Sequence, residues 1–149
     1  MYTIKRTDSD DLDFQSLVQL LDADLAIRDG EDHSFYAQFN KIDSIRHVVV
    51  IFEKDVAIGC GAIKKYGDNT AEVKRMFVLP EKRGKGAAGM ILKELEQWAK
   101  ELHYTKCILE TGKKQPEAIA LYAKHAYRQI PNYGQYVDVT DSVCFEKEL

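Results

Sequence analysis

A glycine-rich stretch that runs directly into an amphipathic helix constrains this chain more than any other feature. Residues 81–101 read EKRGKGAAGMILKELEQWAKE, with three glycines within six residues. Apolar side chains then recur with helical spacing, which predicts a helix over 84–101 with one face toward a core. Glycine costs about 1 kcal/mol relative to alanine inside a helix, so a cluster of glycines at its entrance needs another reason.

A bound phosphate would supply that reason. A helix N-terminus presents unpaired N–H groups and about half a positive charge, and both favour an anion. Glycine removes the side chains that would hold the anion away, and it permits positive φ angles. Lys82, Arg83 and Lys85 add charge of the right sign. The stretch therefore predicts a pyrophosphate-binding loop; the alternative is a glycine-rich turn with solvated lysines.

Other phosphate-binding motifs fit this stretch less well. GKGAAG at 84–89 matches G-x-G-x-x-G, and Glu110 follows at a strand end, as in dinucleotide-binding domains. That fingerprint follows the first strand of its domain directly, whereas here LPEKR intervenes and over half of the chain precedes it. The chain after Glu110 is too short for the rest of such a fold. A P-loop is excluded because no glycine stands five residues before a Gly-Lys-Ser/Thr.

The order of elements predicts one α/β (α+β) domain over residues 1–149 with a mixed sheet. Three consecutive strands separated by turn residues form an antiparallel meander, and a β-α-β unit follows it. The predicted strands cover 2–6, 45–53, 56–66, 71–79, 106–110 and the tail SVCFEKE; the predicted helices cover 10–28, 33–40, 84–101 and a segment starting QPEAIALYAKHAY. The order is therefore β-α-α-β-β-β-α-β-α-β.

Composition excludes several classes of function. The 21 basic and 24 acidic residues give a net charge of −3, which does not indicate nucleic-acid binding. No apolar run approaches the length that spans a membrane, and the N-terminus lacks the apolar core of a signal peptide, so we expect a cytoplasmic protein without a membrane partner. The odd number of cysteines, all in apolar stretches, predicts buried reduced thiols and no metal site; a catalytic cysteine is the alternative.

Two motifs with the correct spacing resemble the GNAT superfamily of acyl-CoA N-acyltransferases. MFVLPEKRGKGAAGMIL is similar to its central motif, a strand and a short loop followed by Arg/Gln-x-x-Gly-x-Gly/Ala at a helix start, filled here by Arg83, Gly86 and Ala88. QPEAIALYAKHAY resembles Asn-x-x-Ala-x-x-Leu-Tyr-x-x-x-Gly-Phe, with Gln115 at the position of the Asn and identical residues at Ala118, Leu121 and Tyr122. This second motif departs from the family at Gln115, Ala126 and Tyr127.

The resemblance implies a mostly antiparallel central sheet flanked by helices and an acetyl-CoA-dependent N-acetyltransferase without a metal. It implies direct transfer of the acetyl group to a primary amine of a small molecule or peptide. Dimerisation is common on this fold, which leaves a homodimer open. The residues implied to bind the cofactor are Met76, Phe77, Val78, Arg83, Gly84, Lys85, Gly86, Ala87, Ala88, Gly89 and Gln115. The alternatives are a noncatalytic acyl-CoA sensor and a dinucleotide-dependent oxidoreductase.

Catalytic roles also follow from the resemblance. Tyr122 is the candidate acid for the leaving thiolate; without the motif, it would be a core residue. Glu72 and Glu110 occupy positions that two branches of the family use for a general base, and each could instead be a strand-end charge. Candidate acceptor-binding residues are His33, Tyr36, Asn40 and Tyr133.

Overall fold

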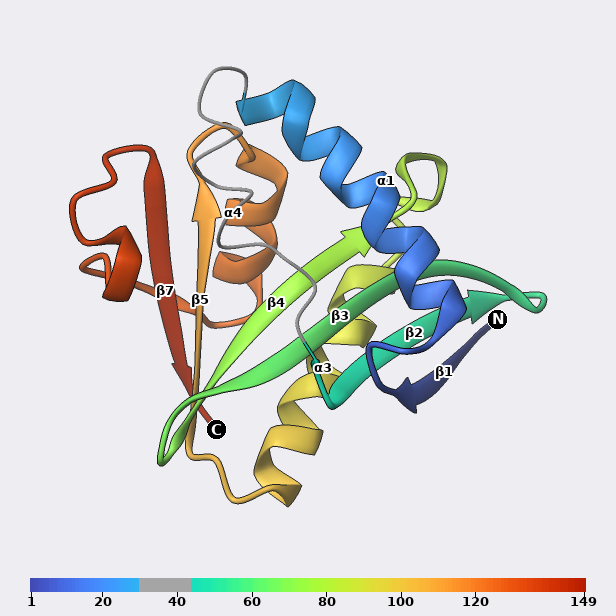
Figure 1. Ribbon diagram of the computed structural model, residues 1–149, viewed down its shortest axis with the longest axis horizontal. Coiled ribbons are helices and arrows are strands. Elements are labelled where there is room, and N and C mark those ends of the chain that lie inside the picture. The colour runs from blue at the N-terminus through green and yellow to red at the C-terminus, as the bar shows by residue number, and fades with distance from the viewer. Residues whose placement is uncertain (30–43) are drawn as a thin grey trace.

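A seven-stranded mixed sheet organises the protein, in the order β1-β2-β3-β4-β5-β7-β6 (Figure 1). The computed structural model describes residues 1–29 and 44–149. The strands are β1 (Tyr2–Thr7), β2 (His47–Glu53), β3 (Val56–Gly67), β4 (Thr70–Val78), β5 (Lys106–Gly112), β6 (Arg128–Ile130) and β7 (Ser142–Glu148). The helices are α1 (Leu12–Asp29), α3 (Ala87–Glu101) and α4 (Pro116–Lys124). Every neighbouring pair of strands is antiparallel except β4 and β5, which are parallel.

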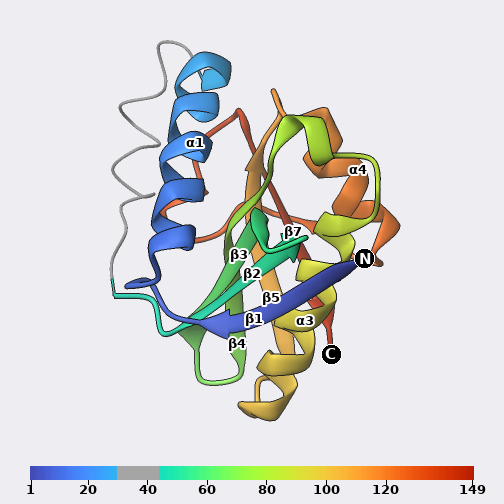
Figure 2. The ribbon, with the colours of Figure 1, turned by 90° about the vertical axis from the view of Figure 1, so that its right-hand side faces the viewer.

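Helices cover both faces of the sheet (Figure 2). Strand β2 shows why: Val48 and Val50 point to the side of α1, whereas Val49 and Ile51 point to the side of α3. On the α1 side they pack with Phe14, Leu17, Val18 and Leu21, and on the α3 side with Ile91, Leu92 and Leu95. The unbroken apolar run of this strand therefore reflects burial on two faces.

The structure confirms the predicted fold class and, among the described residues, the order of the predicted elements, with one additional strand and with differences at the ends of elements. The helix predicted from residue 84 begins at Ala87, because the glycines before it adopt loop conformations. Strand β6 was not predicted; it has three residues and pairs with β7 at the edge of the described sheet. The helix predicted over 33–40 lies outside the described residues.

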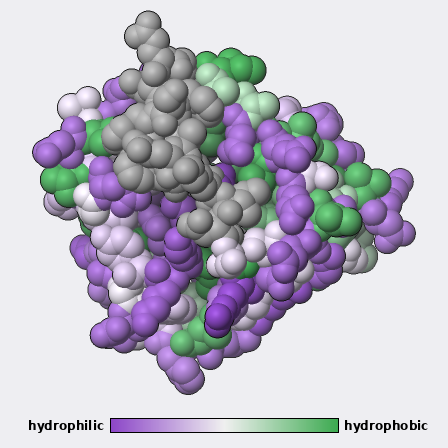
Figure 3. Space-filling view, in the orientation of Figure 1, coloured by the Kyte–Doolittle hydropathy of each residue, from purple (hydrophilic) through white to green (hydrophobic). Residues whose placement is uncertain are grey.

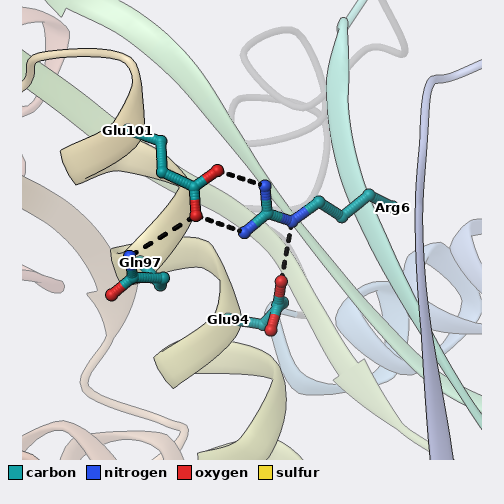
Figure 4. Close-up of polar contacts among 4 residues, drawn as sticks. All are labelled: Arg6, Glu94, Gln97 and Glu101. Atoms are coloured by element: carbon teal, nitrogen blue, oxygen red, sulfur yellow. Dashed lines mark hydrogen bonds and ion pairs between the residues drawn. The ribbon is translucent and has the colours of Figure 1, made fainter.

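Arg6 joins the edge strand β1 to helix α3 (Figure 4). Its Nε donates to Glu94 at 2.7 Å, and its two terminal nitrogens donate to Glu101 at 2.7 and 3.0 Å. The guanidinium also lies over the Trp98 ring, 4.8 Å from its centre. These contacts fix the edge strand to α3, and none of the four side chains lines the cleft described below, so we assign them a structural role.

We expect Arg6→Ala to lower the free energy of unfolding by about 1–2 kcal/mol, because partly exposed charged hydrogen bonds contribute less than buried ones. The melting temperature should fall by several degrees. Arg46→Ala is the control, since Arg46 is exposed and forms no ion pair among the residues that the structure describes. Equal melting temperatures for the two variants would contradict this role of Arg6.

Outside the grey atoms, the face seen in Figure 3 is dominated by hydrophilic side chains, with hydrophobic ones scattered among them. None of the helices described is both long and apolar enough to cross a membrane.

Candidate active site

A cleft opens where β4 and β5 separate. The two strands pair only from Thr70 to Glu72 on β4, opposite Lys106 to Ile108 on β5. Beyond that point they diverge (Figure 1). The cleft between them has a volume of about 310 Å³. It is lined by β4 and β5, by the glycine-rich loop, by α1 and α4, and by Tyr136 from the connection between β6 and β7.

A β-bulge in β4 accompanies this separation. Arg75 and Met76 together oppose Gly61 of β3, since Cys60 pairs with Phe77 and Ala62 with Lys74. Arg75 has φ of 61°, which bends the strand. A side chain at Gly61 would be crowded, because a Cβ there would lie 2.6 Å from the Met76 sulfur and 2.8 Å from Cγ2 of the buried Ile91. The bulge therefore turns the end of β4 away from β5.

The bulge leaves one backbone edge of β4 facing the cleft. Phe77 and Val78 pair with Cys60 and Gly59 on the β3 side. On the other side, the pairing of β4 with β5 ends at Glu72. The main-chain groups of 76–78 on that edge can therefore hydrogen-bond an extended ligand, in the way that a free sheet edge binds an additional strand.

The glycine-rich loop ends in a helix N-terminus without a side-chain cap. Gly84 and Gly86 have φ of 80° and 87°, the left-handed conformation that favours glycine. Helix α3 starts at Ala87, and no side chain of a described residue caps it. Nothing lies within 4 Å of a Cβ added at Gly84 or Gly86, so the loop surface is open there. The first N–H groups of α3 therefore have the geometry of an anion site.

The three basic side chains of this loop differ in their contacts. Lys82 donates to Glu53 at 2.5 Å. The Arg83 Nε donates to the Val78 carbonyl at 2.8 Å, and its guanidinium lies 5.5 Å from the centre of the Phe77 ring. Lys85 is exposed, and no ion pair of Lys85 occurs among the described residues. Arg83 thus braces the end of β4, and Lys85 is the cation best placed to meet an anion from solvent.

We expect Gly86→Asp to weaken the binding of acetyl-CoA, the cofactor that the sequence resemblance implies, at least tenfold, because it places a negative charge beside the helix N-terminus. Isothermal titration measures the affinity. Gly86→Asn is the matched control, since asparagine has the same size and a similar tolerance of positive φ but no charge. Equal affinity of the Asp and Asn variants would contradict the prediction that negative charge at this position weakens binding.

Tyr122 comes from α4 and lies in the wall of the cleft. Its side chain is buried, with its ring 5.8 Å from that of Tyr127 and 6.2 Å from that of Phe145. Burial, followed by the nearby charge of Glu110, raises the pKa of Tyr122 well above its ordinary value. No described residue hydrogen-bonds the hydroxyl. Tyr122 is therefore a neutral phenol that borders the cleft.

The two candidate bases face the cleft from neighbouring strands. Glu72 pairs in register with Ile108, and Glu110 stands two residues further along β5, so both side chains point to the same face. Glu72 is only 8% exposed; its Oε2 accepts a hydrogen bond of 2.6 Å from the Tyr133 hydroxyl, and its Oε1 lies 3.8 Å from Lys74 Nζ. Glu110 Oε2 accepts one of 2.7 Å from the Ser142 hydroxyl.

The structure brings most of the predicted site residues together. Those that line the cleft are Glu72, Met76, Phe77, Val78, Arg83, Gly84, Ala88, Glu110, Gln115 and Tyr122. Lys85, Gly86, Ala87 and Gly89 belong to the adjoining loop and first helical turn. His33, Tyr36 and Asn40 lie outside the described residues. Tyr133 lies against Glu72.

Sequence reasoning missed Ser142, Lys74 and Arg75. Ser142 reaches Glu110 only through the antiparallel register of β5 and β7, which places it opposite Gly112. Arg75 lines the cleft because of the bulge. Local sequence carries no signal for either feature, because both depend on a partner strand.

The cysteines are free and buried, as the sequence predicts. Burial raises the pKa of Cys60 and of Cys107 to about 12. Both remain protonated near neutral pH and are poor nucleophiles. No group of three or more His, Cys, Asp or Glu side chains within 1–29 and 44–149 could hold a metal ion.

Known proteins resemble this chain in sequence and in fold. The model of the acetyltransferase (GNAT) family matches residues 14–127. An IAA acetyltransferase of Azospirillum brasilense is 37% identical over 97 residues, which are 62% of this chain and 61% of that protein. The chain thus spans about three fifths of that relative's length.

Solved structures match over nearly the full chain. One from Klebsiella pneumoniae subsp. pneumoniae MGH 78578, named as an acyl-CoA N-acyltransferase, has a TM-score of 0.84 and 28% identity and covers 100% of this chain and 98% of its own. A GNAT family acetyltransferase from Elizabethkingia anophelis with acetyl-CoA bound has a TM-score of 0.69 and 19% identity, covering 99% and 98%. The second likeness concerns the fold alone.

Proposed function

Because the chain belongs to the GNAT acetyltransferase family, we propose that it moves an acetyl group from acetyl-CoA directly to a primary amine of a small molecule or peptide, in a ternary complex. The observation that carries the proposal is one continuous path. The path runs from the cleft between β4 and β5, along the free edge of 76–78, to the uncapped N-terminus of α3. In acetyl-CoA, the thioester, the extended pantetheine arm and the pyrophosphate follow one another in the same order as these three parts of the path.

The cofactor would be held largely by main-chain groups. The pantetheine amides would pair with the free edge of Met76, Phe77 and Val78, as an added strand pairs with a sheet edge. The pyrophosphate would accept hydrogen bonds from the N–H groups of 84–89, with Lys85 adding charge. Gln115, at the N-terminus of α4, would contact the cofactor from the opposite side of the cleft.

Acetyl transfer needs a neutral amine, a polarised carbonyl and a protonated leaving group. The amine nitrogen forms a bond to the thioester carbonyl carbon, and the carbon–sulfur bond then breaks. Backbone N–H groups of 76–78 would stabilise the charge on the carbonyl oxygen. Tyr122 would give its phenolic proton to the thiolate, and Glu110 would accept a proton from the amine. Both side chains border the same cleft.

Relatives support this assignment of donor and reaction. The Azospirillum protein is named an acetyltransferase, and the structure from Elizabethkingia contains acetyl-CoA. A structure from Thermoplasma acidophilum with a TM-score of 0.74, PaiA N-acetyltransferase, contains coenzyme A. A cytoplasmic location and the amine acceptor are part of the proposal.

Two measurements test the proposal. Isothermal titration should show binding of acetyl-CoA and none of NAD; the reverse would indicate an oxidoreductase. A screen of primary amines with acetyl-CoA should release free thiol, detected with a thiol reagent, and mass spectrometry should find the acetylated amine. Binding of acetyl-CoA without thiol release from any amine would indicate an acyl-CoA sensor and overturn the enzymatic role.

A further inference from the structure

One segment of the chain contacts both carboxylates of the cleft. This segment, 132–142, connects β6 to the start of β7. Near its beginning, the Tyr133 hydroxyl donates to Glu72 at 2.6 Å. At its end, the Ser142 hydroxyl donates to Glu110 at 2.7 Å. Glu72 and Glu110 belong to different strands, so the segment bridges the opening between β4 and β5.

Internal contacts make the segment a closed unit. The Asn132 side-chain amide donates to the carbonyls of Val139 and Ser142, at 2.9 and 3.0 Å. Asn132, the neighbour of Tyr133 in the chain, is thus hydrogen-bonded to Ser142, whose hydroxyl contacts Glu110. The backbone N–H of Ser142 also donates to the Val139 carbonyl, at 3.1 Å. The two carboxylate contacts are therefore parts of one closed turn.

Aromatic contacts fix the Tyr133 ring. It meets the Tyr66 ring edge-on at 5.1 Å and the Tyr136 ring at 5.9 Å, and Tyr136 is itself buried at 2% exposure. Burial, with the charge of Glu72 as the next cause, raises the pKa of Tyr133 far above its ordinary value. The phenol therefore remains a hydrogen-bond donor to the carboxylate over the whole range of neutral pH.

We infer that segment 132–142 positions both carboxylates of the cleft, through the hydroxyls of Tyr133 and Ser142. Each hydroxyl directs one carboxylate oxygen and so restricts the rotation of its side chain. Charge-assisted hydrogen bonds of this kind are about twice as strong as neutral ones. We thus assign Tyr133 the positioning of Glu72 in place of the acceptor-binding role predicted for it from sequence, and the kinetic test below distinguishes the two roles.

Double-mutant cycles in urea test the inference without using activity. Tyr133→Phe is made in the parent protein and in Glu72→Met, and Ser142→Ala in the parent and in Glu110→Met, because methionine keeps the length of glutamate and removes the acceptor. Each hydroxyl deletion should lower the equilibrium constant for folding about fivefold in the parent protein. In the methionine background, the same deletion should lower this constant less than twofold. An equal loss in both backgrounds, in either cycle, overturns the inference. If a methionine variant does not fold, the corresponding Glu→Gln variant replaces it, and the loss should still be smaller there.

Kinetics then separate positioning from acceptor binding, and this second test rests on the proposed function. Tyr133→Phe and Ser142→Ala should each lower kcat about fivefold or more and leave the KM for the amine within twofold. Ser142→Thr, which keeps a hydroxyl at this position, should have most of the parent kcat that Ser142→Ala loses. A raised KM with unchanged kcat in Tyr133→Phe, or no change in either constant, overturns the inference.

Tyr66→Phe is the matched control for Tyr133→Phe. Tyr66 belongs to the same aromatic group but is 47% exposed, and its hydroxyl does not contact Glu72. Its kcat and KM should match the parent values, and an equal fall in kcat for both phenylalanine variants overturns the inference. If the parent protein releases no thiol with any amine, the proposed enzymatic function fails, and the urea cycles alone decide whether the segment holds the carboxylates.

Discussion

Tyr122→Phe is expected to lower kcat at least tenfold, because general acids contribute roughly 10²–10⁴-fold to proton transfer. The substitution removes one oxygen and keeps the ring contacts with Tyr127 and Phe145. Since burial and the charge of Glu110 raise the pKa of Tyr122, the phenol holds its proton throughout the assay range. The loss should therefore be the same at pH 6 and pH 9, measured as thiol release under saturating substrates.

Tyr127→Phe provides the comparison. Tyr127 lies against Tyr122 and is equally buried, but its hydroxyl donates to Glu96 at 3.0 Å and does not line the cleft. This variant should lose stability and keep its kcat. The affinity for acetyl-CoA should stay within twofold in both variants. An unchanged kcat together with a lower melting temperature in Tyr122→Phe would make the tyrosine a core residue.

The glycine-rich loop could be predicted from sequence because its signal is local. Three glycines with basic neighbours, followed by a helical apolar pattern, indicate a helix N-terminus that must stay open. The structure has the two positive φ angles and the uncapped helix that this prediction requires. The element order was equally accessible, because period-2 and period-3.6 patterns are properties of short windows.

The opening of the cleft could not be predicted in this way. It depends on the bulge at Arg75, and the bulge depends on how β3 and β4 pair, with two residues opposite Gly61. A left-handed arginine has no sequence signal of its own. Likewise, local sequence carries no signal that Lys82 donates to Glu53, or that Arg83 donates to the Val78 carbonyl, because both contacts depend on how the chain folds.

Geometry favours Glu110 over Glu72 as the base. The Glu72 side chain is only 8% exposed, whereas Glu110 is half-buried and so more accessible to an amine. Glu110 lies close enough to Tyr122 for its charge to contribute to the raised pKa of that phenol. An acid and a base that flank one thioester can serve the leaving thiol and the attacking amine at the same time.

We therefore expect Glu110→Gln to lower kcat/KM by roughly 10²-fold near neutral pH, within the range for a general base. A base must be ionised, so activity in the parent falls as pH decreases and the carboxylate takes up a proton. The activity of the glutamine variant should lack this decrease at low pH. It should recover partly at high pH, where the amine is already neutral. Glu72→Gln, the matched control on the neighbouring strand, should keep the shape of the profile. The opposite pattern would make Glu72 the base. Identical profiles for both variants and the parent would mean that the amine loses its proton to water.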